Sequence, residues 1–168
     1  MGNTSGNDAV AITIRQAVED DVQQIGKLWV QLVAYHRERD TRLPMAAEDG
    51  ETLYAARIRD RLDDSHTRTY VAVTETGEVV GFTLGLILDL VPEMFMPEIS
   101  GFLADIYVSP AYRGHGTGRK LVEALMAWFK SRGVTHLELY VATKNAEGRA
   151  FWAKMGGRDI MQRVRVEI

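Results

Sequence analysis

Three glycines alternate with other residues in a short segment that also carries two arginines. The segment reads Arg113-Gly-His-Gly-Thr-Gly-Arg119 and lies between a β-branched, aromatic run and a helical pattern. Glycines at such a place let the backbone approach a ligand closely and aim N–H groups at an anion. The dipole of the following helix adds favourable positive charge at its N-terminus. The segment therefore predicts a binding site for a phosphate group.

Two common phosphate-binding patterns do not fit this segment. The P-loop pattern fails because Gly118 follows Gly114 after only four residues and because Leu121 stands where a magnesium-binding hydroxyl belongs. The dinucleotide pattern G-x-G-x-x-G requires a glycine where Arg119 stands, and it normally opens a domain. These mismatches argue against a site for nucleotide hydrolysis or dinucleotide binding.

A third pattern, R-x-x-G-x-G, fits Arg113, Gly116 and Gly118. The longer segment "DIYVSPAYRGHGTGRKLVEAL", residues 105–125, resembles the signature segment of the GNAT superfamily of acyl-CoA-dependent N-acetyltransferases. A second segment, "NAEGRAFWAKMGG" at 145–157, resembles the downstream motif of that family, with an asparagine, an aromatic pair and a glycine. Together the motifs cover about residues 104–157.

The resemblance implies acetyl-CoA as the co-substrate, with no metal. Its pyrophosphate would lie on the N–H groups of the glycine loop, and its pantetheine arm between the preceding strand and the downstream motif. The implied cofactor-binding residues are Ile106, Tyr107, Val108, Arg113, Gly114, His115, Gly116, Thr117, Gly118, Arg119, Asn145, Phe151 and Trp152.

The reaction that the resemblance implies is direct attack of a neutral amine on the thioester, with both substrates held together. The backbone N–H of Val108 is expected to stabilise the oxyanion. A carboxylate or an ordered water chain must take the proton of the ammonium. Related polyamine-acetylating proteins often have Glu-Asp in the first strand, where this chain has Ala104-Asp105, so Asp105 is the candidate base.

The candidate for a general acid is less clear. The family often places a tyrosine at the second aromatic position of the downstream motif, and this chain has Trp152 there. An indole N–H donates a hydrogen bond but cannot serve as a useful acid. Tyr107 and Tyr140, on the two central strands, are the remaining hydroxyl candidates, and Tyr107 is included among the catalytic residues.

The elements that position these residues follow the order β-α-α-β-β-β-α-β-α-β. Alternating patterns predict strands at 10–17, within 67–90 on both sides of a turn at 76–77, at 101–110, at 135–143 and at 158–168. Helical patterns and caps predict helices at about 21–38, 51–62, 116–132 and 145–155. The expected α/β fold is a GNAT-like single domain over 10–168. A mixed central sheet carries helices on both faces, after a disordered lead-in at 1–9.

Composition narrows the class of protein. The 168 residues carry a net charge of −3 with scattered basic residues, which argues against nucleic acid as the main partner. No apolar run approaches the ~20 residues of a membrane helix. The chain has no cysteine, which excludes thiol chemistry and fits a cytoplasmic protein. His36, His66 and His136 lack the spacing of metal ligands.

Acidic residues gather in the N-terminal third and in the 90–100 connection, so the expected substrate is a small cationic amine. These residues are Asp40, Glu48, Asp49, Asp89, Glu93 and Glu98, and Tyr35 is grouped with them for substrate selection. The alternatives are a protein lysine or N-terminal acetyltransferase and a non-catalytic acyl-CoA-binding sensor module. A homodimer is the expected oligomer, and "MFMPEI" at 94–99 lines either a substrate pocket or the dimer face.

Overall fold

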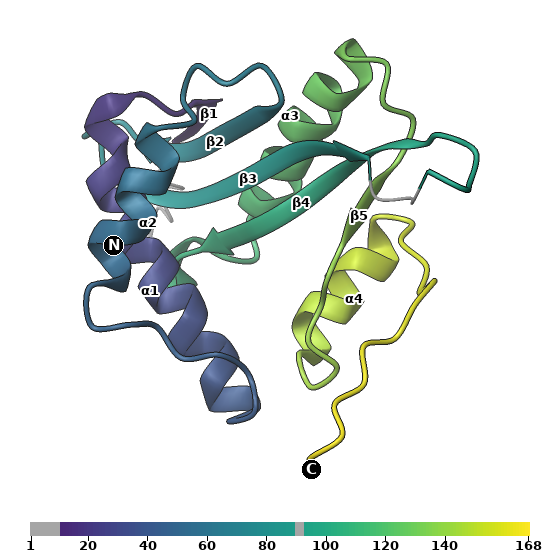
Figure 1. The fold of residues 1–168 in the computed structure, drawn as a ribbon. Helices are drawn as coiled ribbons and strands as arrows, with labels where there is room; N and C mark the ends of the chain where they lie inside the picture. Colours follow the sequence, from purple (N-terminus) through teal and green to yellow (C-terminus); the bar gives the residue numbers. More distant parts are fainter. Residues whose placement is uncertain (1–10, 90–92) are drawn as a thin grey trace, which may run out of the picture.

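The computed structural model describes residues 11–89 and 93–168, so the predicted lead-in at 1–9 lies outside the described residues. The elements, drawn in Figure 1, are β1 Ile12–Gln16, η1 Glu19–Asp21, α1 Val22–Arg39, α2 Gly50–Arg59, β2 Thr67–Thr74, β3 Val79–Asp89, β4 Ile99–Val108, η2 Pro110–Tyr112, α3 Thr117–Ser131, β5 Leu137–Leu139 and α4 Ala146–Lys154. The two η elements are single turns of 3-10 helix.

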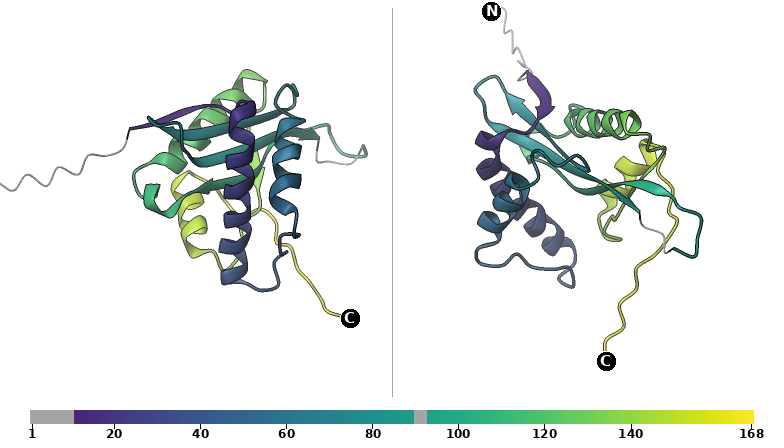
Figure 2. Two further views of the ribbon diagram at one scale, coloured as in Figure 1. Left: turned by 90° about the vertical axis from the view of Figure 1, so that its left-hand side faces the viewer. Right: turned by 45° about the horizontal axis from the view of Figure 1, so that its top comes forward.

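The strands form one mixed sheet in the order β1-β2-β3-β4-β5. The first three pairs are antiparallel, and β4 and β5 are parallel because helix α3 connects them. Helices α1 and α2 cover one face of this sheet, and α3 lies on the other face (Figures 1 and 2). The predicted fold class, a mixed α/β sheet between helices, is therefore confirmed.

Each face of the sheet has its own hydrophobic core. On one face Val22, Ile25, Leu28 and Leu32 of α1 recur at the spacing of three and four residues that turns a helix stripe inward. On the other face α3 buries a stripe of its own, made by Leu121, Val122, Leu125 and Phe129. Burial of each such side chain stabilises the fold by about 1.5–3 kcal/mol. These two cores hold α1 and α3 rigidly against opposite faces of β4.

A buried carboxylate fixes the start of α1. Asp21, only 2 % exposed, accepts two hydrogen bonds from the Arg15 guanidinium at 2.6 and 2.9 Å. It also accepts the backbone N–H of Val18 at 2.9 Å. The N-cap residue of α1 thus ties the helix to strand β1 instead of bonding the free N–H groups of its own helix.

Strand β4 contains a bulge at Ala104. Leu84 of β3 pairs with Asp105, and Gly85 pairs with Leu103, so Ala104 is an extra residue without a partner in β3. A bulge of this kind bends the strand and ends regular pairing on its other side. Accordingly, β5 pairs with β4 only as far as Leu103.

The bulge also reverses the direction of the backbone groups along β4. Before it, Gly101 donates its N–H to the carbonyl of His136 at the start of β5, at 3.1 Å. After it, Ser109 donates its N–H to the carbonyl of Val80 in β3, at 2.8 Å. Because these groups alternate along a strand, the N–H groups of Ile106 and Val108 face the side of β5. Since β5 has already ended, this edge of β4 is open.

Two sequence predictions about strands need correction. The strand predicted at 135–143 is reduced to Leu137–Leu139, because the bulge turns β4 away and leaves the following residues without a partner. The strand predicted at 158–168 is wrong, since those residues form no regular element. Their alternating pattern suits a strand, but a strand also needs an edge to pair with. Their large apolar side chains are exposed: Ile160, Met161, Val164, Val166 and Ile168.

Within residues 11–89 and 93–168, none of the helices is both long enough and apolar enough to cross a membrane.

Candidate active site

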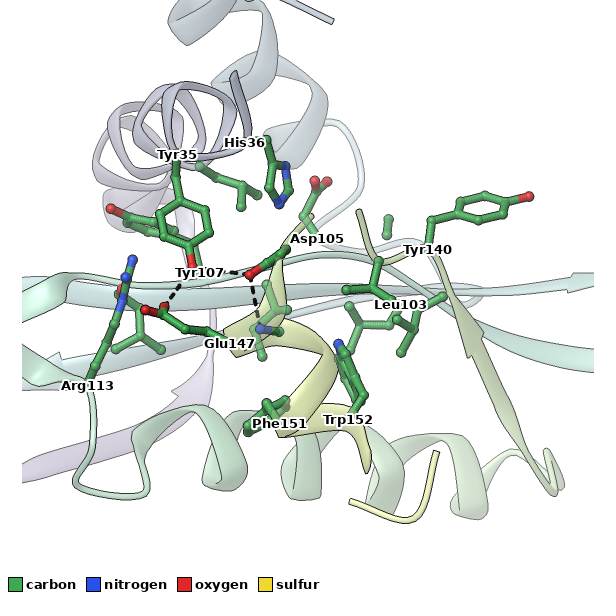
Figure 3. Close-up of a pocket in the computed structure, with 18 residues that line it drawn as sticks. Tyr35, His36, Leu103, Asp105, Tyr107, Arg113, Tyr140, Glu147, Phe151 and Trp152 are labelled. Atoms are coloured by element: carbon green, nitrogen blue, oxygen red, sulfur yellow. Dashed lines mark hydrogen bonds between the residues drawn. The ribbon is translucent and has the colours of Figure 1, made fainter. Parts of the chain in front are cut away.

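A cleft lies where β4 and β5 separate, and α1 and α4 supply its other walls (Figure 3). Seven of the predicted cofactor-binding residues line it: Ile106, Tyr107, Val108, Arg113, Asn145, Phe151 and Trp152. All three predicted catalytic residues, Asp105, Tyr107 and Val108, line the same cleft. The structure therefore brings the two sequence motifs together around one space.

The remaining predicted residues, Gly114 to Arg119, form the end of the loop that follows β4 and the first turn of α3, which begins at Thr117. Gly114 and Gly116 have φ of +80° and +82°, a left-handed conformation that glycine adopts without strain. Nothing lies within 4 Å of a Cβ placed on either one, so the loop is open at these positions. Gly116 is the N-cap of α3, whose first N–H groups have no partner within the helix. This is the geometry of an anion site at a helix N-terminus.

Arg113 turns its side chain back into the cleft. Its Nε donates to the carbonyl of Val108 at 2.7 Å. Its guanidinium lies 4.9 Å from the ring centre of Tyr35 and 5.2 Å from that of Tyr107. The side chain thus holds the corner between β4 and the loop, and its positive charge lies at the junction of loop and cleft.

Asp105 is held by a partner on helix α2. Its carboxylate accepts a hydrogen bond from the Tyr54 hydroxyl at 2.8 Å, and the Tyr54 ring is stacked on Trp29 with 4.8 Å between ring centres. Burial raises the pKa of Asp105 above its ordinary value, although the Tyr54 hydrogen bond and the charges of Arg57 and His36 oppose the rise. A carboxylate with a raised pKa is better matched to accepting a proton near neutral pH.

His36 of α1 lies beside Asp105 in the cleft (Figure 3). Burial lowers the pKa of His36, and the charge of Arg39 lowers it further, while Asp105 acts in the opposite direction. Burial at this place therefore works against a charged imidazole next to Asp105.

Helix α4 is joined to α1 across the cleft. Asn145 caps α4 by accepting the N–H of Gly148 at 3.0 Å, and it also lines the cleft, as predicted. The Tyr35 hydroxyl contacts the Asn145 side-chain oxygen at 3.3 Å and donates to the Glu147 carboxylate at 2.8 Å. Arg39 lies over the Tyr35 ring, 3.3 Å from its centre, and 3.9 Å from Glu147.

The two tyrosines proposed from the sequence face in different directions. The Tyr107 ring is buried in the cleft wall, and its hydroxyl donates to the side-chain oxygen of Gln31 on α1 at 3.3 Å. Tyr140 is 78 % exposed, and its ring packs edge-on against Phe102 and points away from the cleft (Figure 3). The Trp152 indole lines the cleft where related proteins often have a tyrosine.

The sequence missed part of the site. Of the residues proposed for substrate selection, Tyr35 lines the cleft, whereas the described acidic ones do not; Asp40, for example, is paired with Arg42 and Lys144. The carboxylates that do line it are Asp105 and Glu147. Glu147 stands in the first turn of the helix that Asn145 caps, and its position in the downstream motif was the available signal. The described part of the chain contains no group of three or more His, Cys, Asp or Glu side chains that could hold a metal ion.

Comparison with known proteins gives a consistent result. Residues 29–157 match the model of the acetyltransferase (GNAT) family. The mycothiol acetyltransferase of Amycolatopsis mediterranei is 37 % identical over 82 residues, which cover 49 % of this chain and 27 % of that protein. The aminoglycoside N(6')-acetyltransferase type 1 of Stenotrophomonas maltophilia is 32 % identical over 130 residues, covering 77 % and 74 %. The chain spans less than half the length of several curated relatives that it matches.

Among solved structures, an aminoglycoside N-acetyltransferase in complex with CoA superposes with a TM-score of 0.72 at 16 % identity, covering 96 % of this chain and 97 % of that one. At this identity the likeness concerns the fold.

The contact between Tyr54 and Asp105 predicts a measurable change in acidity. Replacing Tyr54 by Phe removes a hydrogen bond that stabilises the charged carboxylate, so the pKa of Asp105 should rise further. A hydrogen bond to a charged group is worth about 1.5–3 kcal/mol, or about one to two pKa units. Carboxyl-carbon NMR of the labelled protein measures the titration. Tyr70→Phe, on β2, is the matched control and should leave the pKa unchanged; an equal shift in both variants would contradict the assignment.

Proposed function

Because the chain belongs to the acetyltransferase (GNAT) family, we propose that it transfers an acetyl group from acetyl-CoA to a primary amine of a small cationic molecule. Family membership makes the protein an acyltransferase that uses an acyl-CoA; the acetyl group and the amine are the proposal. The observation that carries it is the open edge of β4, which runs directly into the glycine loop at the N-terminus of α3.

The open edge and the loop suit two parts of acetyl-CoA, its pantetheine arm and its pyrophosphate. The pyrophosphate would accept hydrogen bonds from the N–H groups of the loop at 113–119, with the α3 dipole and Arg113 adding positive charge. The pantetheine arm would lie along β4, taking the place of the strand that β5 does not provide beyond Leu103. Asn145, Phe151 and Trp152 would cover its other side.

The acid–base groups suit direct acyl transfer. An ammonium held over the thioester would lose a proton to Asp105, the partly buried carboxylate that faces the cleft. Its nitrogen would then attack the thioester carbon, and the negative charge on oxygen would be met by the N–H of Val108 on the open edge. Holding both substrates in the cleft supplies a large part of the rate by orientation.

The charge of the cleft supports a cationic amine. Asp105 and Glu147 offer carboxylates on opposite walls, one from β4 and one from α4. A relative that the chain covers over most of its length is named for acetylation of an aminoglycoside, a small molecule with several amino groups. Protein acetylation and acyl-CoA binding without turnover are the competing functions.

The direct test mixes the purified protein with acetyl-CoA and a panel of small amines and records release of the CoA thiol. We expect turnover with at least one polycationic amine. Asp105→Asn should lower kcat/KM by about 10²-fold or more, the usual contribution of a general base. Because burial raises the pKa of Asp105, the wild-type rate should rise with pH through a value above the ordinary range of an aspartate.

The matched control is Asp63→Asn, at an exposed position after α2, which should keep the wild-type rate. Turnover that Asp105→Asn leaves intact would contradict the assignment of the base. No thiol release with any amine, together with acetylated lysines or N-termini in mass spectrometry of treated lysates, would favour protein acetylation. Tight acetyl-CoA binding without either outcome would favour a binding module.

We also propose that the protein is a homodimer. Large apolar side chains are exposed at Met94, Phe95 and Met96 in the segment before β4, at Ile99, the first residue of β4, and in the C-terminal residues 160–168. A surface of this kind marks an interaction site in a soluble protein. Light scattering of the purified chain should give twice the monomer mass, and Phe95→Glu should shift it toward the monomer. A monomeric wild type at micromolar concentration would contradict the proposal.

A further inference from the structure

The site as described has a base for the amine and no acid for the leaving thiolate. Trp152 occupies the position at which related proteins often carry a tyrosine, and an indole N–H does not deliver a proton. We propose that Tyr35, on helix α1, supplies this hydroxyl and protonates the CoA sulfur as it leaves. The inference rests on the proposed acetyl transfer.

The other hydroxyl groups of the cleft are directed elsewhere. Tyr35, Tyr107 and Tyr140 are the tyrosines that line it. The Tyr107 hydroxyl is bonded to Gln31 on α1, and Tyr140 projects outward against Phe102. Tyr35 projects from α1 across the cleft toward α4, the helix that carries Trp152 (Figure 3).

The contacts of Tyr35 place its hydroxyl over the cleft-facing side of α4. The hydroxyl oxygen lies 2.8 Å from Glu147 and 3.3 Å from the Asn145 side-chain oxygen. Gly148 and Trp152 both line the cleft and are four residues apart, so they share one helix face. Glu147 precedes Trp152 by five residues, about 7.5 Å along the axis at 1.5 Å per residue. Tyr35 therefore reaches the same wall from the opposite helix.

The charges around Tyr35 suit a group that gives up its proton and recovers it. Burial and the hydrogen bond to Glu147 raise its pKa, so the phenol stays protonated at neutral pH. Arg39 and Arg113 oppose that rise, with guanidinium groups 3.3 and 4.9 Å from the ring centre. These two cations would stabilise the phenolate that exists after the proton has moved.

The proton balance of the reaction closes with these residues. Asp105 takes the proton of the ammonium, and the neutral amine nitrogen then forms a bond to the acyl carbon and releases its second proton to water. The carbon–sulfur bond breaks, the electron pair stays on sulfur, and the sulfur takes the Tyr35 proton. To give it, the hydroxyl turns its hydrogen from Glu147 to the sulfur by rotation about the C–O bond. The Glu147 side chain is 72 % exposed, so Tyr35 regains a proton from water at that carboxylate.

The test compares Tyr35→Phe, Trp152→Tyr and the double variant with the wild type. Tyr35→Phe should lower kcat by about 10²-fold, the low end for acid–base catalysis, since a thiolate is a good leaving group. The KM for acetyl-CoA should stay within about threefold, because the hydroxyl acts on the transition state. Trp152→Tyr alone serves as the reference for the double variant, because it also alters a wall of the cleft. In the double variant it should recover about tenfold or more of the lost rate, because a hydroxyl returns to the same wall.

Tyr70→Phe is the matched control and should keep the wild-type kcat. A purely structural tie between α1 and α4 predicts a different pattern: Tyr35→Phe would weaken acetyl-CoA binding in calorimetry, and Trp152→Tyr would not restore the rate. That pattern, or an unchanged kcat in Tyr35→Phe, overturns the inference while leaving the acetyltransferase function in place. A wild type without turnover on any amine, peptide or protein overturns both.

Discussion

The extra residue in β4 is the constraint on which the site depends. Without Ala104, the N–H groups after Leu103 would continue to pair with β5, and the two parallel strands would close the sheet. With it, the strand presents the N–H groups of Ile106 and Val108 to an edge that has no neighbour. One inserted residue thus creates the space for a substrate arm and the row of donors that would bind it.

The same bulge decides which side chains meet in the cleft. Ala104 packs on the α1 and α2 side of the sheet, and so does Tyr107. Asp105 bonds to Tyr54 of α2. Leu103 faces the opposite core around α3. The candidate base therefore lies on the α1 side of the strand, where Tyr35 and His36 also project. The bulge at Ala104 therefore determines both the open edge of β4 and the side of the strand on which the proton-transfer groups lie. The two hydrophobic cores hold this strand in place.

Local patterns predicted much of the fold and the loop. The stripes of α1 and α3, the turn between β2 and β3 and the left-handed glycines each follow from short-range sequence. The cross-cleft contact of Tyr35 with Glu147 could not be predicted, because 112 residues separate its partners. For the C-terminal segment, by contrast, the sequence predicted a strand that does not form. Its alternation of Val and Arg suits a strand, but pairing depends on an edge that the sequence does not reveal.

The most direct test of this account is an NMR titration of the backbone N–H groups of β4 with acetyl-CoA. The account predicts large shifts and slower hydrogen exchange at Ile106 and Val108, together with the loop at 114–119. Small changes are expected at Asp105 and Tyr107, because the alternation of backbone groups along the strand points their N–H groups toward β3. Equal changes at all four strand positions, or changes confined to other elements, would contradict the claim that the bulge opens this edge for the acyl donor.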